Sequence, residues 1–193
     1  CIRDRVRLRR WFQLERDERR CGICLSDPLI YEAFTYYDRE VLPYKNDDVI
    51  NAHAMPGAHA ALQAVQDAGL RCALFTNPSF PQGAIECRMG WGDLADAPFE
   101  LVTHMGNTTR CKPDATYYLE QLQVMGLEPH EVLMVGNDPK RDFPSPDCGI
   151  QTAFVGQGKP SRATWRGTME DFAREFNAVV EAFYEHQIAD ELS

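Results

Sequence analysis

The segment Glu131-Val-Leu-Met-Val-Gly-Asn-Asp-Pro-Lys-Arg-Asp142 joins a run of apolar residues to a glycine and two spaced aspartates. A short apolar run that stops at turn-forming residues is typical of a fully buried strand, here predicted over residues 131–135. In parallel sheets, ligands bind beyond the carboxyl ends of the strands, where side chains are free to converge. The segment therefore predicts a buried strand followed by polar residues, Asp138 and Asp142 among them, at the edge where a site forms.

Strand and helix patterns alternate on both sides of this segment. Strands are predicted over residues 71–75, 99–102 and 151–155, and a helix over residues 82–90. Three further helices are predicted from apolar residues that share one face: Ala61, Leu62, Val65 and Ala68 between Pro56 and Gly69; Ala115, Tyr118, Leu119 and Leu122 between Pro113 and Gly126; and Phe172, Phe176, Val179, Val180 and Phe183 near the end. Such alternation predicts an α/β fold, a doubly wound parallel sheet with helices on both faces.

The first fifty residues have a different pattern. Ile30, Phe34, Tyr37 and Val41 recur at helical spacing, and no alternating strand pattern accompanies them. Pro43 and the polar residues that follow interrupt this pattern before the alternating part begins. The sequence therefore predicts a helical subdomain over residues 1–50 and an α/β core over residues 51–193.

Composition excludes several classes of protein. The chain has 20 basic and 29 acidic residues; residues 1–20 hold eight arginines among four acids, and the remainder carries a net charge of −13. This balance indicates no nucleic-acid partner, and the absence of any long apolar run indicates no membrane span. Seven scattered cysteines, with Cys21 and Cys24 in a lone CxxC, favour a reducing cytoplasm over a disulfide framework or a zinc site.

Polar residues follow three of the predicted elements. Thr76 and Asn77 come directly after one strand, Lys112 lies in the loop after another, and Asp138 and Asp142 follow the third. Each feature alone is common in turns and at helix starts. Their order and their position at strand ends together point to a shared site.

The stretches ALFTN (73–77), CKPDATYY (111–118) and VLMVGNDPKRD (132–142) resemble the second, third and fourth motifs of the haloacid dehalogenase-like (HAD) superfamily. The resemblance extends from about residue 50 to residue 156. It implies a HAD-like Rossmannoid core with a small helical cap, the cap being residues 1–50. It also implies a phosphatase or related hydrolase that acts on a small phosphorylated substrate.

The resemblance assigns a role to each matching residue. Thr76, Asn77 and Lys112 would bind the phosphate, Thr76 and Lys112 as catalytic residues, since phosphoryl transfer depends on positioning and on neutralising charge. Asp138 would bind Mg²⁺, a hard cation that needs only one or two protein carboxylates. Asp142 would bind or orient the same metal and could also hold Lys112. Many relatives have an aspartate in place of Asn137, so the first metal ligand is either Asn137 or Asp138, and Asp138 is preferred because it carries charge.

The first motif of the superfamily, an Asp-x-Asp that ends the central strand and supplies the nucleophile, does not occur in this sequence. Asp47 and Asp48 follow a polar loop and cannot replace it. Since the sequence starts at Cys1 and directly in a helical pattern, we expect the missing strand and loop, roughly twenty residues, to lie upstream. The 193 residues alone would then be inactive.

Three alternatives stay open. A HAD-like protein that has lost its nucleophile would be a non-catalytic binding or structural protein, and residues upstream of Cys1 would distinguish it. A true dehalogenase uses no metal, so the acidic pair Asp138 and Asp142 counts against that alternative. A phospho-accepting receiver domain would not explain the cap. The sequence does not define the substrate, the oligomeric state or the cap residues that set specificity.

Overall fold

The computed structural model describes residues 27–46, 52–160 and 162–191. The chain falls into two compact units that divide between Ala52 and His53. The predictions for residues 1–26, including the CxxC at Cys21 and Cys24, and for Asp47 and Asp48 lie outside the described residues. Within the described part, no helix is both long enough and apolar enough to cross a membrane.

The described part of the first unit is helical, as the apolar spacing predicts. It consists of α2 (Pro28–Tyr36), a π-helical turn (Tyr37–Val41) and a 3-10 turn (Leu42–Tyr44). The Asp27 carboxylate accepts a hydrogen bond from the Leu29 N–H at 2.9 Å, which satisfies one of the free amide groups at the start of α2. The helical prediction for residues 28–44 is confirmed.

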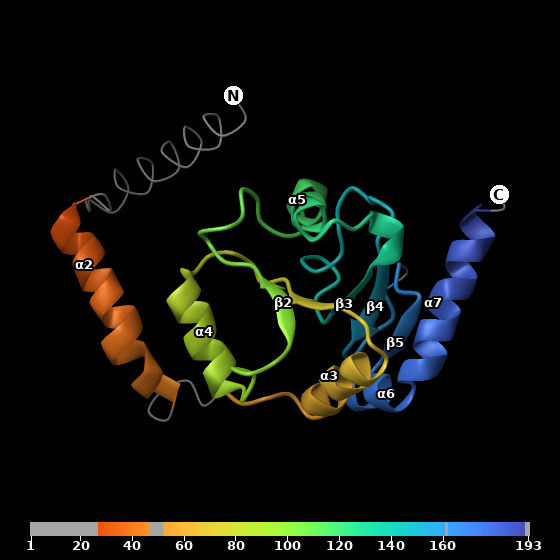
Figure 1. Cartoon of the computed structure of the whole chain (residues 1–193), viewed down its shortest axis with the longest axis horizontal. Coiled ribbons are helices and arrows are strands. Elements are labelled where there is room, and N and C mark those ends of the chain that lie inside the picture. The colour runs from red at the N-terminus through yellow and green to blue at the C-terminus, as the bar shows by residue number, and fades with distance from the viewer. Residues whose placement is uncertain (1–26, 47–51, 161, 192–193) are drawn as a thin grey trace. The chain divides into compact units, whose positions relative to one another are not determined.

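The second unit alternates helices and strands (Figure 1). Its elements are α3 (Ala58–Asp67), β1 (Cys72–Leu74), α4 (Gln82–Trp91), β2 (Phe99–Val102), α5 (Ala115–Met125), η4 (Pro129–Glu131), β3 (Leu133–Gly136), β4 (Gln151–Val155), β5 (Trp165–Gly167), α6 (Met169–Arg174) and α7 (Phe176–Glu191). The four predicted strands are present with small shifts at their ends. The short strand β5 was not predicted, because three residues that include Arg166 and Gly167 give no apolar run.

All strand pairs are parallel, as predicted, but they form two sheets. One sheet contains β1 and β2, and the other has the order β3-β4-β5. Because side chains alternate across a strand, each face of the second sheet packs against different helices. Leu133 and Val135 contact the cluster of α3, α6 and α7, whereas Met134 packs with the buried face of α5.

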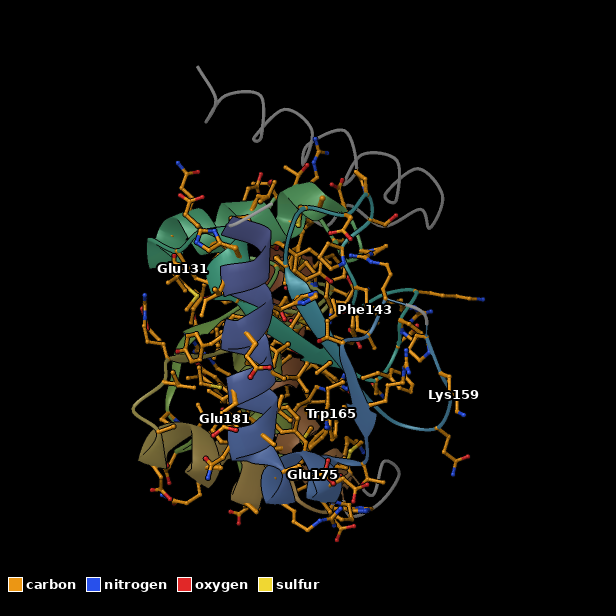
Figure 2. The ribbon with its side chains drawn as sticks, turned by 90° about the vertical axis from the view of Figure 1, so that its right-hand side faces the viewer. Glu131, Phe143, Lys159, Trp165, Glu175 and Glu181 are labelled. Carbon is orange, nitrogen blue, oxygen red and sulfur yellow. The ribbon has the colours of Figure 1, made fainter. Side chains whose placement is uncertain are left out.

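Figure 2 shows the face of the second sheet that α7 covers. Trp165 of β5 packs edge-on against Phe172 of α6, and Phe172 packs edge-on against Phe176 of α7. Glu175 lies at the turn that separates the two helices. The single final helix that the sequence predicts is therefore two helices, although Phe172, Phe176, Val179 and Val180 do meet in one cluster.

The prediction that residues 131–135 form a fully buried strand was wrong in one respect. Leu133, Met134 and Val135 are only partly buried, whereas Thr152 to Val155 of β4 are buried. The difference arises because β4 has a strand on each side, whereas β3 pairs with a single strand among the described residues. Strand β1, which also has one partner in that part of the chain, is partly buried for the same reason.

The edges of β1 and β3 that no described strand pairs with lie beneath the same two layers of helices. On one face, Ala64 and Val65 of α3, the helix that precedes β1, pack in the cluster that contains Leu133 of β3. On the other face, Phe75, which follows β1, packs in the same α5 cluster as Met134. The helices thus bridge two sheets that share no backbone ladder among the described residues.

The apolar face predicted for α5 is partly corrected. Ala115, Tyr118 and Leu122 are buried, but Leu119 is 41% exposed, and Tyr117 takes its place in the core with no exposed surface. The buried stripe runs through residues 115, 117–118 and 121–122, so Leu119 falls on its flank. The helix ends at Gly126 in the left-handed conformation, as predicted.

Gly57 is the residue that lets α3 start close to α6. Its φ is +85°, a left-handed conformation, and a β-carbon at this position would lie 2.5 Å from the amide nitrogen of Glu170. Gly69 after α3 has a similar φ of +67°, but a β-carbon there would have no atom within 4 Å. Of the two glycines, only Gly57 therefore combines a conformational requirement with a steric one.

We expect Gly57→Ala to destabilise the chain more than Gly69→Ala. Gly69→Ala should lower the free energy of unfolding by about 1–2 kcal/mol, because it adds only left-handed strain. Gly57→Ala should lower it by about 1–3 kcal/mol more, because the backbone at Glu170 must also shift. Urea denaturation gives both free energies of unfolding. Equal losses would show that α3 and α6 do not meet this closely.

Candidate functional site

A buried ion pair joins the two sheets beyond the ends of their strands. The ammonium of Lys112 lies 2.6 Å from Asp142 Oδ1, and the two side chains are only 9% and 11% exposed. Lys112 also donates to the carbonyl oxygen of Phe75 at 2.9 Å. Since Phe75 precedes Thr76, one ammonium connects the loop after β1 to the loop after β3.

The second oxygen of Asp142 is bound to the backbone. Asp142 Oδ2 accepts hydrogen bonds from the N–H groups of Asn137 at 3.0 Å and Asp138 at 2.9 Å. This close approach depends on Gly136, where a β-carbon would lie 2.8 Å from Asp142 Cγ. Asp142 therefore holds Lys112 and shapes its own loop, and both of its oxygens are occupied by protein donors.

Asp138 is the more accessible carboxylate. Its side chain is 43% exposed, Oδ1 accepts from the Lys140 N–H at 3.0 Å, and Oδ2 lies 3.6 Å from Arg141 Nε. Among the described residues, no group of three or more acidic, histidine or cysteine side chains is arranged to hold a metal ion. The residues present thus fit part of a Mg²⁺ site, with Asp138 and the neighbouring Asn137 as oxygen donors, which suits a cation that retains several waters.

Thr76 is held by a network centred on Thr103, which is fully buried. The Thr76 N–H donates to Thr103 Oγ1 at 2.7 Å, and the Thr76 hydroxyl donates to the Thr103 carbonyl at 2.8 Å. The single hydroxyl proton of Thr76 is therefore engaged within the protein. The N–H of Asn77 makes no hydrogen bond to another described residue, so it is the backbone donor of this loop that is open to a ligand.

Two consecutive tyrosines of α5 support these loops, although the sequence alone did not indicate them as site residues. Tyr117 Oη donates to the Thr76 carbonyl at 2.7 Å, and Tyr118 Oη donates to the Asp142 carbonyl at 2.6 Å. Burial raises the pKa of both phenols above the ordinary tyrosine value, so both hydroxyls keep their protons and remain donors. The signal that could have revealed them is the Tyr-Tyr pair close behind Lys112, which otherwise reads only as part of a helix pattern.

The predicted site residues form one chain of contacts. Thr76 adjoins the Phe75 carbonyl that Lys112 binds, Lys112 binds Asp142, and Asp142 binds the amide of Asp138. These contacts bring the ammonium of Lys112 close to the loop of the exposed Asp138 carboxylate, and the loop after β1 adds the Asn77 N–H as a further donor. This arrangement suits an anionic ligand and a hard cation bound side by side.

Comparison with known proteins identifies the family. The model of the haloacid dehalogenase-like hydrolases matches residues 9–146, well over half of the chain. The chain belongs to this family. The HAD match spans the loops of Thr76, Lys112 and Asp142, and so includes every contact described above.

Individual HAD proteins agree with this result. A phosphoglycolate phosphatase of Rhodospirillum rubrum is 29% identical over 116 residues, which are 60% of this chain and 46% of that protein. A β-phosphoglucomutase structure from Clostridium difficile superposes with a TM-score of 0.60 at 15% identity, over 82% of this chain and 67% of that one. A HAD-family hydrolase from Deinococcus radiodurans, with bound phosphate and sodium, gives a TM-score of 0.54 at 19% identity over 78% and 74%.

The two structures show that the fold is the HAD-like α/β fold. The chain spans less than half of the length of the curated relative that it matches.

We expect the loss of one member of the Lys112–Asp142 pair to destabilise the chain strongly. Lys112→Met leaves a buried carboxylate without its partner, which should cost about 3–5 kcal/mol. Urea denaturation measures this loss. Adding Asp142→Asn should recover part of it, because the uncompensated charge is then removed.

The exposed pair between Arg71 and Glu100 is the matched control, with side chains 44% and 45% exposed. Glu100→Gln should lower the free energy of unfolding far less than Lys112→Met, because solvent already screens that pair. If Lys112→Met were as stable as Glu100→Gln, the prediction that Asp142 is buried and needs Lys112 as its partner would be wrong.

Proposed function

We propose that the whole protein is a Mg²⁺-dependent phosphohydrolase that acts on a small phosphorylated metabolite through an aspartyl-phosphate intermediate. The observation that carries this proposal is the buried ammonium of Lys112, held between the Phe75 carbonyl and Asp142 beside the Thr76 loop. A fixed positive charge at this point favours the approach of a carboxylate to a phosphoryl group, two anions that otherwise repel.

The phosphate would bind to the loop after β1 and to Lys112. The Asn77 N–H is available as a donor, and the Thr76 hydroxyl joins it if it turns away from the Thr103 carbonyl. Such donors become more effective where charge develops in the transition state, since they are already oriented. Thr76, Asn77 and Lys112 are therefore the proposed phosphate-binding residues, and Lys112 is the proposed catalytic cation.

The nucleophile in this proposal is an aspartate on a strand between β1 and β3, contributed by residues upstream of Cys1. Support comes from the edges of β1 and β3, which no strand of the described part of the chain occupies, beneath shared helices, and from the partial burial of both strands. A carboxylate oxygen there would attack phosphorus as the ester P–O bond breaks, and the leaving alkoxide would take a proton from a second aspartate. Water would then cleave the acyl phosphate, releasing inorganic phosphate and the free carboxylate.

Asp138 and Asn137 are the proposed metal ligands of this chain, completed by the upstream aspartates. Mg²⁺ bound there would neutralise negative charge on the phosphoryl oxygens. Asp142 orients the loop and Lys112 in this proposal, because its oxygens already accept three hydrogen bonds. Asp138 keeps its carboxylate partly open to solvent, as a ligand must.

The proposed substrates are small phosphate monoesters. The similarity to a phosphoglycolate phosphatase makes 2-phosphoglycolate the first compound to test. A cytoplasmic location is part of the same proposal, and Cys72, Cys111 and Cys148 are thiols rather than halves of disulfides, in keeping with it. The second candidate function is a non-catalytic phosphate-binding protein, which the Asn77 N–H and Lys112 would serve if no upstream aspartate exists.

We expect the full-length protein, with its upstream residues, to hydrolyse p-nitrophenyl phosphate and 2-phosphoglycolate only when Mg²⁺ is present. Asp138→Ala should abolish turnover because the charged metal ligand is lost, and Lys112→Ala should do so because the central cation is lost. Phosphate release is the measurement, with the exposed-pair variant Glu100→Gln as a control of unchanged activity.

Hydrolysis that persists with a chelator would refute the metal-dependent mechanism. Turnover by residues 1–193 alone would show that the nucleophile lies within the sequence. Phosphate binding without turnover in the full-length protein would favour the binding function.

A further inference from the structure

The tyrosine pair of α5 connects the two halves of the site by separate routes. Tyr117 and Tyr118 have no exposed surface, and their rings meet edge-on with centroids 5.0 Å apart. Consecutive residues on a helix point about 100° apart. The hydroxyl of Tyr117 therefore reaches the loop after β1, and that of Tyr118 reaches the loop after β3.

Tyr117 controls the direction of one peptide group. Its hydroxyl lies 2.7 Å from the Thr76 carbonyl and 2.9 Å from Thr103 Oγ1, which in turn accepts from the Thr76 N–H. The Thr76 carbonyl and the Asn77 N–H belong to the same planar peptide and point in opposite directions. Fixing the carbonyl toward Tyr117 therefore aims the Asn77 N–H away from the core, where a ligand can reach it.

Tyr118 acts on the acidic loop. Its hydroxyl lies 2.6 Å from the Asp142 carbonyl and 3.1 Å from that of Arg141. The same loop is closed by the Asp142 N–H, which donates to the Asp138 carbonyl at 2.6 Å. Holding its C-terminal end sets where Asp138 presents its carboxylate.

We propose that Tyr117 and Tyr118 are positioning residues with separate effects: Tyr117 sets the affinity for phosphate through the Asn77 amide, and Tyr118 sets the affinity for the divalent cation through Asp138. This inference rests on the proposed function and extends it to two residues that touch neither ligand. Separate effects are expected because the two hydroxyls bind carbonyl groups of different loops, Tyr117 that of Thr76 and Tyr118 those of Arg141 and Asp142.

The test uses the full-length protein and the variants Tyr117→Phe and Tyr118→Phe. Each removes one hydroxyl and keeps the ring packing. We expect Tyr117→Phe to raise KM for p-nitrophenyl phosphate about tenfold, the effect of losing one net hydrogen bond, with the Mg²⁺ concentration for half-maximal activity unchanged. Tyr118→Phe should show the reverse pattern, with that Mg²⁺ concentration raised and KM at saturating Mg²⁺ unchanged.

Two further variants make the result decisive. Thr103→Val removes the Oγ1 atom that accepts from the Thr76 N–H and contacts the Tyr117 hydroxyl, so it should loosen the same loop and share the Tyr117→Phe profile even if Tyr117→Phe fails to fold. Tyr184→Phe, at an exposed tyrosine of α7, is the matched control and should leave both parameters unchanged.

Each remaining outcome is informative. If both tyrosine variants only lower kcat in proportion to the folded fraction, their role is structural and the inference is overturned, while the proposed function stands. If both variants raise KM and the Mg²⁺ requirement together, separate control is likewise overturned. If the wild-type protein has no Mg²⁺-dependent turnover, the proposed function fails and this inference fails with it.

Discussion

The ion pair between Lys112 and Asp142 is the contact on which the second unit of this protein depends. It connects loops from two sheets that share no strand ladder among the described residues, and it is almost fully removed from solvent. Removing two charges from water is costly unless both are fully hydrogen-bonded. The Phe75 carbonyl and the amides of Asn137 and Asp138 supply those bonds, so the pair is satisfied on both sides.

This requirement explains the composition of the surrounding positions. Gly136 has no side chain, because Asp142 occupies the space that a β-carbon would need. The carbonyls of Thr76 and Asp142 each accept a hydrogen bond from a tyrosine hydroxyl of α5, so neither is left buried without a partner. The same contacts that stabilise the fold also orient the groups that would bind phosphate and metal. Stability and the arrangement of the site are therefore properties of one network.

Much of this organisation could be predicted from the sequence. The apolar runs at residues 99–102 and 151–155 give the strands, and the left-handed glycines Gly69 and Gly126 end the helices where expected. The order of Thr76, Lys112 and Asp138 at strand ends indicated a common site, because parallel strands end at the same edge. Family membership followed from the same stretches and is confirmed.

Other features could not be predicted from a single sequence. The burial of β3 depends on which neighbours it has, and the choice of Tyr117 over Leu119 for the core depends on which side of α5 faces the sheet. The bond from the Thr76 hydroxyl to Thr103 spans 27 residues, which no local pattern reveals.

The edges of β1 and β3 that are unpaired among the described residues restrict which segment could pair with both. Helices cover both faces, so an inserted segment must be extended and must present alternate side chains to two apolar layers. Its sequence would resemble β4, apolar on both faces, rather than an amphipathic strand. Proline in its middle would be excluded, since the segment's own N–H groups must complete ladders on either side. The two edges thus limit which sequences could form a strand that pairs with both of them.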